Sequence, residues 1–504
     1  MRKSFTLPFT PIPLPLILTF IALSALTAVT AVVSPIVAVA LAGVTFALGV
    51  LLTIREGLPR FAIIWLGVVL LGYALLDRGF AYVGVPPLFI GEVTLALCVA
   101  AVLFATRPAW LLRSPLTALL VIFMLIGAAA TVPHIGKYGL DSLRDSATWY
   151  YATFAIVTAV LLVRTGTVVE AARQYARFVP LFLLFAPVAI ALDQFANSMI
   201  PRFPGSGVPV LELKFGDVAV HLAIVAGLLI LGLGARFNPR LTGRGREWMW
   251  WGLWLVASVI PVFRVRAGLV AILLAGLLIV LFRPGSRWGK PFAIVALTVA
   301  LFFASGVTLR LGSERYIISA ETLLLNLQSI TGSSGDTVRD GTKEWRLNWW
   351  KHITKYTVNG PYFWTGKGNG VNLADADGFQ VYDDGSLRSP HSIHYVILAR
   401  SGVPGLVAWI ALQAWFVGSL FVAYFRARAA GQDLWARLNL WVLAAWVAFI
   451  INASFDVYLE GPQGGIWFWC VFGYGMALLE AQRRARLSGD ASPLPRAATA
   501  EARA

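Results

Sequence analysis

Two of the 5 histidines in this 504-residue sequence, His391 and His394, lie three positions apart in the stretch RSPHSIHYVILARSGVPGL, residues 388–406. A neutral imidazole can take a proton from an attacking hydroxyl group, so each histidine is a candidate general base. Ser389 is a good N-cap and Pro390 suits the first helical position, so we expect His391 in the first turn of a helix. The positive end of the helix dipole there favours the neutral imidazole that a base needs.

The same two histidines are also compatible with a metal site. Asp383 and Asp384 precede them, but no complete ligand set with a recognisable spacing appears. We therefore expect neither a metal nor another cofactor. A third interpretation is that both histidines are hydrogen-bonded structural residues.

Arginines form the second candidate group. Arg264 and Arg266, in PVFRVRAGLVAIL, separate two apolar runs, and Arg346 lies in EWRLNWWKHI of the later polar segment. The planar guanidinium group binds two phosphate oxygens at once and keeps its charge, which predicts an anion site, most plausibly for a phosphate. The alternative for Arg264 and Arg266 is that they extend toward the membrane surface at a tight outer turn. An interfacial helix for the segment with Arg346 and Trp349 is compatible with the anion site, because it would hold Arg346 at headgroup depth.

Gly366 and Gly368, in NGPYFWTGKGNG, form the third candidate site. Glycines let a backbone approach a ligand closely, and a turn-rich loop without a ligand explains them equally well. The Gly-Val-Pro-Gly stretch at 402–405 is expected to break the helix that follows the histidines.

The elements that position these residues are membrane helices. The chain is 58% hydrophobic and only 13% charged, and apolar runs of about 18 or more residues indicate spanning helices, because a helix pairs its own backbone groups inside lipid. We expect an all-α polytopic integral membrane protein with about fourteen transmembrane helices. The apolar runs are 12–33, 35–54, 60–77, 88–106, 114–133, 147–163, 176–197, 216–235, 248–263, 265–282, 292–309, 403–424, 437–456 and 465–483.

The formal charge of +16 is explained by topology rather than by a nucleic-acid partner. When the N-terminus is placed in the cytoplasm and sides alternate at each span, the cytoplasmic segments hold most Lys and Arg and few Asp and Glu, as the positive-inside rule requires. This orientation predicts that both termini are cytoplasmic and that the segment 310–390 lies outside.

Four regions follow from this topology. Residues 1–309 are expected to form transmembrane helices 1–11, and residues 310–390 one long extracytoplasmic loop with short interfacial helices near 314–328 and 343–356. Between these helices the stretch TGSSGDTVRDG is expected to be a flexible turn, and residues 359–388 are expected to be irregular. Residues 391–484 form the C-terminal transmembrane helices, and residues 485–504 a disordered cytoplasmic tail.

Three motifs in this order resemble the O-antigen ligase and O-antigen polymerase superfamily. They are Val265-Arg266-Ala267-Gly268; Arg346-Leu347-Asn348-Trp349 followed by Pro361 and Gly366-Lys367-Gly368; and His391-Ser392 followed by Gly402 and Gly405. The resemblance covers about residues 215–425. The sequence departs from the family pattern at Ser392, where the family has Asn, and at Val265, where it has Ser, which leaves the substrate class open.

The resemblance implies a glycosyltransferase-C-like enzyme of the bacterial inner membrane with its active site on the periplasmic face. Such enzymes transfer a glycan from undecaprenyl diphosphate to lipid A–core or a similar acceptor, with inversion and without a metal. His391 would be the catalytic base, and Arg266 and Arg346, with Arg264 as a further candidate, would bind the diphosphate. His394, Gly366, Gly368 and Trp349 would shape the substrate site.

Three alternatives stay open. An O-antigen or polysaccharide polymerase would extend the glycan on its carrier, and a protein O-oligosaccharyltransferase would use a protein hydroxyl group as acceptor. A membrane transporter for an anionic lipid or sugar is the alternative of another class, with Glu92 and Asp193 at the edges of spans as its support.

Overall fold

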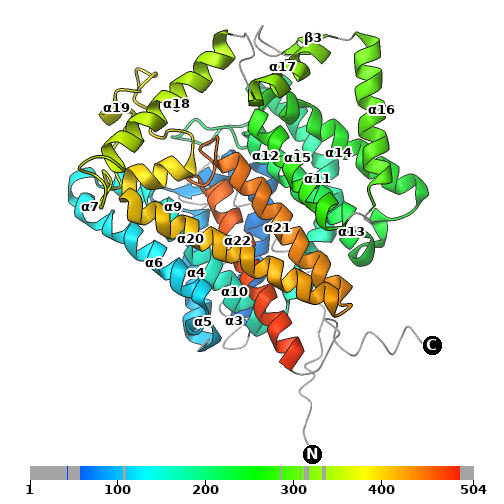
Figure 1. The fold of residues 1–504 in the computed structure, drawn as a ribbon, viewed down its shortest axis with the longest axis horizontal. Helices are drawn as coiled ribbons and strands as arrows, with labels where there is room; N and C mark the ends of the chain where they lie inside the picture. Colours follow the sequence, from blue (N-terminus) through cyan, green and yellow to red (C-terminus); the bar gives the residue numbers. More distant parts are fainter. Residues whose placement is uncertain are drawn as a thin grey trace, which may run out of the picture.

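The described part of the chain folds into a bundle of α-helices with two short antiparallel strand pairs in the computed structural model (Figure 1). The structure describes residue 43 and residues 57–105, 109–283, 287–306, 308–310, 317–331 and 337–487. The predicted spans 12–33 and 35–54, apart from residue 43, and most of the predicted tail 485–504 lie outside the described residues.

The first half of the described chain consists mostly of apolar helices, with a longer loop before α12. These elements are α3 (Leu58–Leu76), η1 (Arg78–Tyr82), β1 (Gly84–Val85), β2 (Leu88–Phe89), α4 (Ile90–Ala105), α5 (Ala109–Leu112), α6 (Pro115–Ala129), α7 (Val132–Tyr138), α8 (Leu140–Asp145), α9 (Ala147–Tyr150), α10 (Thr153–Thr165), α11 (Val168–Phe195), η2 (Asn197–Met199), α12 (Phe215–Ile230), α13 (Leu233–Phe237) and η3 (Pro239–Leu241).

The second half adds the polar segment and the last helices. Its elements are α14 (Arg244–Arg264), α15 (Arg266–Phe282), α16 (Gly289–Ser305), β3 (Leu309–Arg310), β4 (Ile317–Ile318), α17 (Ala320–Thr331), α18 (Thr337–Thr357), α19 (Leu373–Asp377), α20 (Ile393–Ala429), α21 (Asp433–Ala453) and α22 (Pro462–Leu487). Both strand pairs are antiparallel, β1 with β2 and β3 with β4.

The chain is a multi-pass membrane protein by the length and composition of these helices. Within the described ranges six helices are long and apolar enough to cross a bilayer, or seven if the pair Leu140–Tyr150 and Thr153–Thr165, bent by 44°, is one span. Four shorter apolar helices accompany them: Ile90–Leu103, Phe215–Ile230, Arg266–Phe282 and Gly289–Ser305. These helices support the all-α membrane class, while the count of about fourteen stays a prediction.

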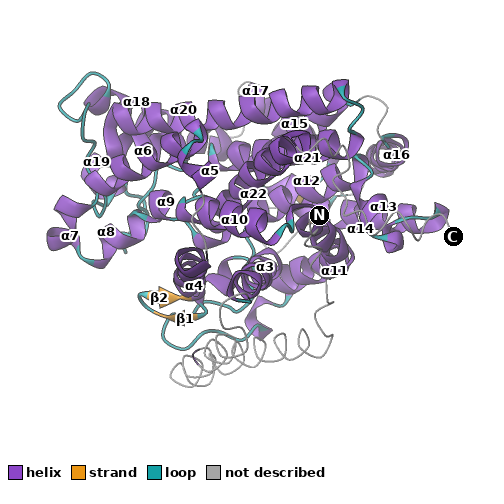
Figure 2. Cartoon of the chain, turned by 90° about the horizontal axis from the view of Figure 1, so that it is seen from below, coloured by secondary structure: helices purple, strands orange, loops and turns teal. Residues whose placement is uncertain are grey.

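The core lies around α21 and α22, whose apolar windows are 72% and 83% buried. α22 packs on α10, and α21 packs on α15, α12 and α20. Figure 2 looks along the bundle and shows these helices grouped together, with α16 at the edge. Because α21 and α22 are enclosed by other helices, the short turn between them is held firmly.

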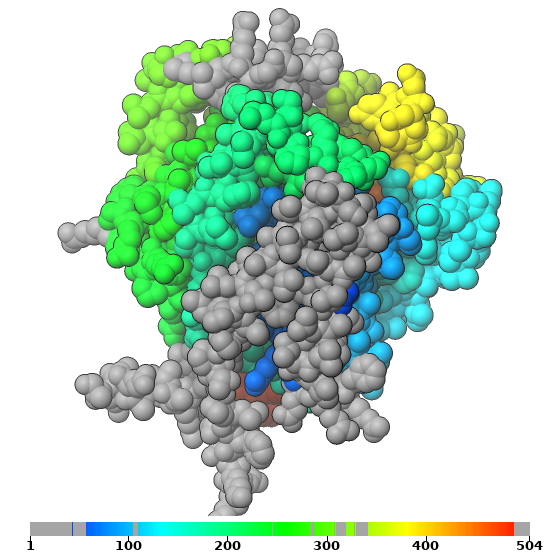
Figure 3. Space-filling model, turned by 180° about the vertical axis from the view of Figure 1, so that it is seen from behind, coloured from blue at the N-terminus to red at the C-terminus, as the bar shows by residue number. Residues whose placement is uncertain are grey.

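The polar segment before α20 is built largely as predicted. α17 and α18 correspond to the two expected helices, and residues 358–392 are irregular apart from α19. The predicted flexible turn is wrong in part, because residues 337–341 already belong to α18. In the space-filling view the yellow surface of this segment adjoins the cyan surface around α7 and α8 (Figure 3). In this region the backbone N–H of Asn369 donates to the Ala130 carbonyl at 2.9 Å.

Candidate active site

His391 lies in the turn before α20 rather than in its first helical turn. The helix begins at Ile393 with Ser392 in the N-cap position, and the backbone of His391 has φ +56°, a left-handed conformation that is uncommon for a residue other than glycine. The expected cap is wrong because the Ser389 hydroxyl donates to the Glu460 carboxylate at 2.6 Å. The helix-dipole argument for His391 therefore does not apply.

A carboxylate faces His391 from the turn between α21 and α22. Nδ1 of His391 lies 3.7 Å from Oδ1 of Asp456, and both side chains are 26% exposed. Burial alone would raise the pKa of the Asp456 carboxyl, but the His391 imidazole and the Lys214 ammonium group outweigh burial and lower this pKa to about 2. Asp456 is thus an anion at neutral pH, and it faces the Nδ1 edge of the ring.

Arg346 reaches the same turn from α18. Its Nη1 donates to the backbone carbonyl of Phe455 at 2.9 Å. Burial lowers the pKa of Arg346, the Asp456 carboxylate raises it, and the positive charge of Arg266 lowers it. Arg346 therefore lies within electrostatic range of both Asp456 and Arg266.

Three of the residues that the sequence singled out for base and diphosphate, His391, Arg346 and Arg266, therefore lie near one short turn. His391 faces Asp456, Arg346 binds Phe455, and Arg266 starts α15 beside Arg346. The elements that carry them are far apart in the sequence and meet only because α18 packs on α20 and α20 packs on α21. A cluster of guanidinium groups and an imidazole suits a reaction in which an anionic group leaves the substrate, because the cations stabilise the charge of the leaving group.

Arg264 has different contacts from Arg266 and Arg346. It ends α14, and its Nη1 donates to the side-chain oxygen of Gln194 on α11 at 2.5 Å. Its guanidinium group lies 4.9 Å from the centre of the Phe215 ring. These contacts connect α14 to α11 and α12, which accounts for an arginine here through packing alone.

His394 is fixed by hydrogen bonds at both ring nitrogens. The indole N–H of Trp409 can only donate, so Nδ1 of His394 accepts that bond at 3.1 Å. The proton of a neutral His394 therefore sits on Nε2, which donates to the Ser454 hydroxyl at 3.0 Å, and that hydroxyl donates to the Ile450 carbonyl at 2.7 Å. These hydrogen bonds connect α20 to α21. They leave His394 no lone pair for a proton from substrate.

Trp349 belongs to the core of the polar segment. It is fully buried, its indole N–H donates to the Asp377 carboxylate at 2.6 Å, and its ring stacks on Phe379 at 5.4 Å. Packing accounts for this residue. Trp345, one turn earlier on α18, is the tryptophan that faces His391. The centres of the two rings are 6.2 Å apart.

The glycine loop closes over a break in α20. Gly402 has φ +66° and ψ −169° inside this helix, which confirms the predicted break. The amides of Lys367 and Gly368 donate to the carbonyls of Ala399 and Arg400, at 2.7 and 3.0 Å, which have no helical partner across the break. A Cβ on Gly366 would lie 2.3 Å from the Arg400 backbone carbon, so the close approach that glycine permits here is to the chain itself.

A buried ion cluster beside the site escaped the sequence analysis. Arg400 is 2% exposed and lies 2.9 Å from the Asp145 carboxylate, and Arg388 lies 3.0 Å from the same carboxylate. Nε and Nη2 of Arg400 are buried without a hydrogen-bond partner. The available signal was the charge of Asp145 and Arg400 at the ends of apolar segments, where charges are costly.

Lys214 and Asp77 also escaped the sequence analysis. The Lys214 ammonium group donates to the Val457 carbonyl at 3.1 Å, directly after Asp456, and its amide donates to Asp77 at 2.6 Å. Burial raises the pKa of the Asp77 carboxyl to about 7. Lys214 therefore connects the turn that carries Asp456 to the end of α3.

Over the described ranges, no three His, Cys, Asp or Glu side chains lie together as a metal-ligand set.

The comparisons with known proteins agree with the resemblance drawn from the motifs. Residues 251–410 match the family model described as O-antigen ligase, and this region includes Arg266, Arg346 and His391. The match indicates an O-antigen ligase-like or polymerase-like enzyme, and such a family implies a lipid-linked glycan and an acceptor in the membrane. No curated protein matches the chain. Residues 251–410 thus match the O-antigen ligase family model, and this match supports the resemblance of the chain to the O-antigen ligase and polymerase superfamily.

Proposed function

We propose that the protein transfers a glycan from undecaprenyl diphosphate to lipid A–core or a similar acceptor, at the outer face of a bacterial inner membrane. The observation that carries this proposal is the meeting of His391, Arg346 and Arg266 around the turn at Phe455 and Asp456. A base and two guanidinium groups are what an acceptor hydroxyl and a diphosphate leaving group require.

In this proposal His391 is the general base. Its Nδ1 edge faces Asp456, so Nε2 is the nitrogen left for substrate. The acceptor hydroxyl oxygen attacks the anomeric carbon and its proton passes to Nε2, while the bond from that carbon to the diphosphate oxygen breaks. The undecaprenyl diphosphate leaves with the electron pair, and attack from the opposite side inverts the anomeric centre.

Arg266 and Arg346 bind the diphosphate in this mechanism. Charge on the leaving oxygen grows in the transition state, and guanidinium groups placed there in advance stabilise it. Arg266 is also the first residue of α15, so the amides of that helix start add partial positive charge at the same point. Arg346 is half-buried, which strengthens its interaction with an anion.

Asp456 acts as a positioning residue. As a permanent anion at neutral pH it holds the ring of His391 by its Nδ1 edge and stabilises the imidazolium that forms during attack. Lys214 and Arg346 in turn hold the backbone on either side of Asp456.

A reconstitution experiment tests the proposed reaction. The purified protein is placed in liposomes with a labelled glycan on undecaprenyl diphosphate, lipid A–core and EDTA, and the products are separated by acceptor. Label on lipid A–core that disappears with His391→Ala supports a metal-independent ligase. Longer glycans on the carrier identify a polymerase, and label on an added protein acceptor identifies a protein O-oligosaccharyltransferase. Movement of the intact carrier-linked glycan across the bilayer without transfer contradicts the enzyme and favours a transporter.

A further inference from the structure

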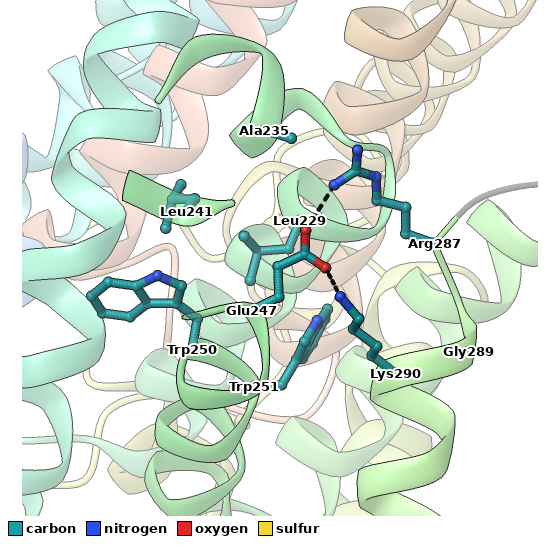
Figure 4. Close-up of a pocket in the computed structure, with 9 residues that line it drawn as sticks. All are labelled: Leu229, Ala235, Leu241, Glu247, Trp250, Trp251, Arg287, Gly289 and Lys290. Atoms are coloured by element: carbon teal, nitrogen blue, oxygen red, sulfur yellow. Dashed lines mark hydrogen bonds and ion pairs between the residues drawn. The ribbon is translucent and has the colours of Figure 1, made fainter. Parts of the chain in front are cut away.

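A cavity of about 370 Å³ opens beside the start of α14, at the end of this helix opposite Arg264. Its lining comes from the end of α12, α13, η3, the start of α14 and the start of α16. Figure 4 shows the side chains that line it: Leu229, Ala235, Leu241, Glu247, Trp250, Trp251, Arg287, Gly289 and Lys290. Its size falls within the range of small-molecule sites in proteins.

The cavity is apolar on one side and cationic on the other. Leu229, Leu241 and two indole rings, of Trp250 and Trp251, form the apolar side. Glu247 lies between Arg287, at 3.2 Å, and Lys290, as the dashed lines in Figure 4 mark. Two cations share one carboxylate, which leaves an unbalanced positive charge.

The unbalanced charge is at the mouth of the cavity. The side chains of Arg287, Lys290 and Glu247 are 55%, 34% and 19% exposed. The two cationic side chains are therefore more exposed at the cavity surface than the Glu247 carboxylate is. An anion can bind both of them from the outside while Glu247 keeps its place.

The span expected at 248–263 lies within α14, so we expect the cavity at the depth of lipid headgroups on the second face of the membrane. Glu247 lies in the first turn of α14 and Arg264 ends this helix, which separates them by about 25 Å along the helix axis, close to the thickness of the hydrocarbon core. Trp248 and Met249, beside the cavity wall, are 44% and 46% exposed, as expected of residues that face lipid at an interface. In the orientation that the charge distribution predicts, this face is cytoplasmic.

We propose that this cavity is a binding site for an anionic glycerophospholipid. The lipid phosphate binds Arg287 and Lys290 at the mouth, and the glycerol and first acyl carbons pack on Trp250, Trp251 and Leu241. Basic pockets between membrane helices on the cytoplasmic side bind anionic lipid headgroups in this way. The site is separate from the site of glycan transfer, and it clamps α16 to α14 at the contact between Lys290 and Glu247.

Thermal unfolding of the full chain in a neutral detergent tests the site. Phosphatidylglycerol is titrated against phosphatidylcholine as the zwitterionic lipid and against inorganic phosphate as the free anion. We expect phosphatidylglycerol to raise the unfolding midpoint of the wild type by about 3 °C or more, through binding to the folded state alone. Phosphatidylcholine and inorganic phosphate at equal concentration are expected to give at most a third of that shift.

A charge-matched pair of variants separates the cavity from general attraction to negative lipid. Arg287→Gln/Lys290→Gln removes the two cations at the mouth, and Arg113→Gln/Arg426→Gln removes two exposed cations elsewhere. The first variant is expected to lose the shift and the second to keep it. An equal shift in both variants, an equal loss in both, or an equal effect of inorganic phosphate on the wild type would overturn the proposal. Because the readout is not glycan transfer, failure here leaves the proposed reaction unaffected.

Discussion

Nδ1 of His391 lies 3.7 Å from Oδ1 of Asp456, on the turn between α21 and α22, two helices that are largely buried. Lys214 and Arg346 bind the backbone on either side of that carboxylate. The base proposed for glycan transfer is thus held against an anion whose position is fixed by the core. His394, in contrast, forms hydrogen bonds at both ring nitrogens, so neither nitrogen is left to accept a proton from substrate.

Asp456→Asn tests the positioning role. The amide keeps the size of the side chain but removes the negative charge that stabilises a protonated His391. We expect kcat for glycan transfer to fall by about 10–10²-fold, with the KM for the carrier-linked donor within about twofold of wild type. Steady-state kinetics in liposomes measure both. A rise in KM with unchanged kcat would instead place Asp456 in donor binding and contradict the positioning role.

Substitutions of Arg346 and Arg264 are expected to lower the rate of glycan transfer by very different factors. Arg346→Gln removes a guanidinium group beside Asp456 and Arg266, so transfer should fall by about 10²–10³-fold. Arg264→Gln removes a group whose contacts include Gln194, the Phe215 ring and the charge of Asp193, so transfer should fall by less than about tenfold. Product formation at saturating donor compares the two. Equal losses would mean that Arg264 also binds the diphosphate.

Gly366 and Gly378 offer a matched test of the glycine loop. Both have positive φ, +62° and +77°, so alanine costs each about 1 kcal/mol of backbone strain. Only at Gly366 does the added Cβ meet the Arg400 backbone, at 2.3 Å, whereas the space around Gly378 is open. Gly366→Ala should therefore lower the thermal midpoint several degrees more than Gly378→Ala does. A similar effect of both substitutions would show that the loop adapts to the new methyl group.

Asp77 gives a prediction for pH. Burial raises the pKa of its carboxyl to about 7 in the folded protein, against 3.8 for an unperturbed aspartate. Folding therefore favours the protonated form, and the stability that this carboxyl contributes is complete below pH 3.8 and lost as pH rises through 7. Asp77→Asn keeps an oxygen for the Lys214 amide and does not titrate. The midpoint of the variant minus that of wild type should increase between pH 4 and pH 8, and a flat or falling difference would contradict this assignment.

The roles of the candidate site residues stay predictions, but the sequence did single out residues that lie close together. Arg266, Arg346 and His391 stood out because charges and histidines are rare in an apolar chain, and the three meet in the structure around Phe455 and Asp456. The break at Gly402 and the helices α17 and α18 were also predictable, since Gly, Pro and amphipathic patterns act locally. The number of spanning helices stays a prediction.

What the sequence did not predict depends on contacts between distant segments. The Ser389 hydroxyl binds Glu460, so the helix starts later than the local cap signal indicates. Trp409 and Ser454 decide the tautomer of His394, and Asp377 and Phe379 bury Trp349. No spacing rule within the chain specifies such partners.

The most direct test of the account is glycan transfer by His391 variants in liposomes, with His352 as the control. His391→Asn adopts the positive φ at this position more readily than alanine does, so it should fold while lacking the base. His352→Ala removes a half-exposed imidazole of the same segment. We predict that His391→Asn and His391→Ala lose at least about 10²-fold of the transfer rate, while His352→Ala stays within about threefold of wild type. Transfer by both folded His391 variants at the wild-type rate would contradict the account.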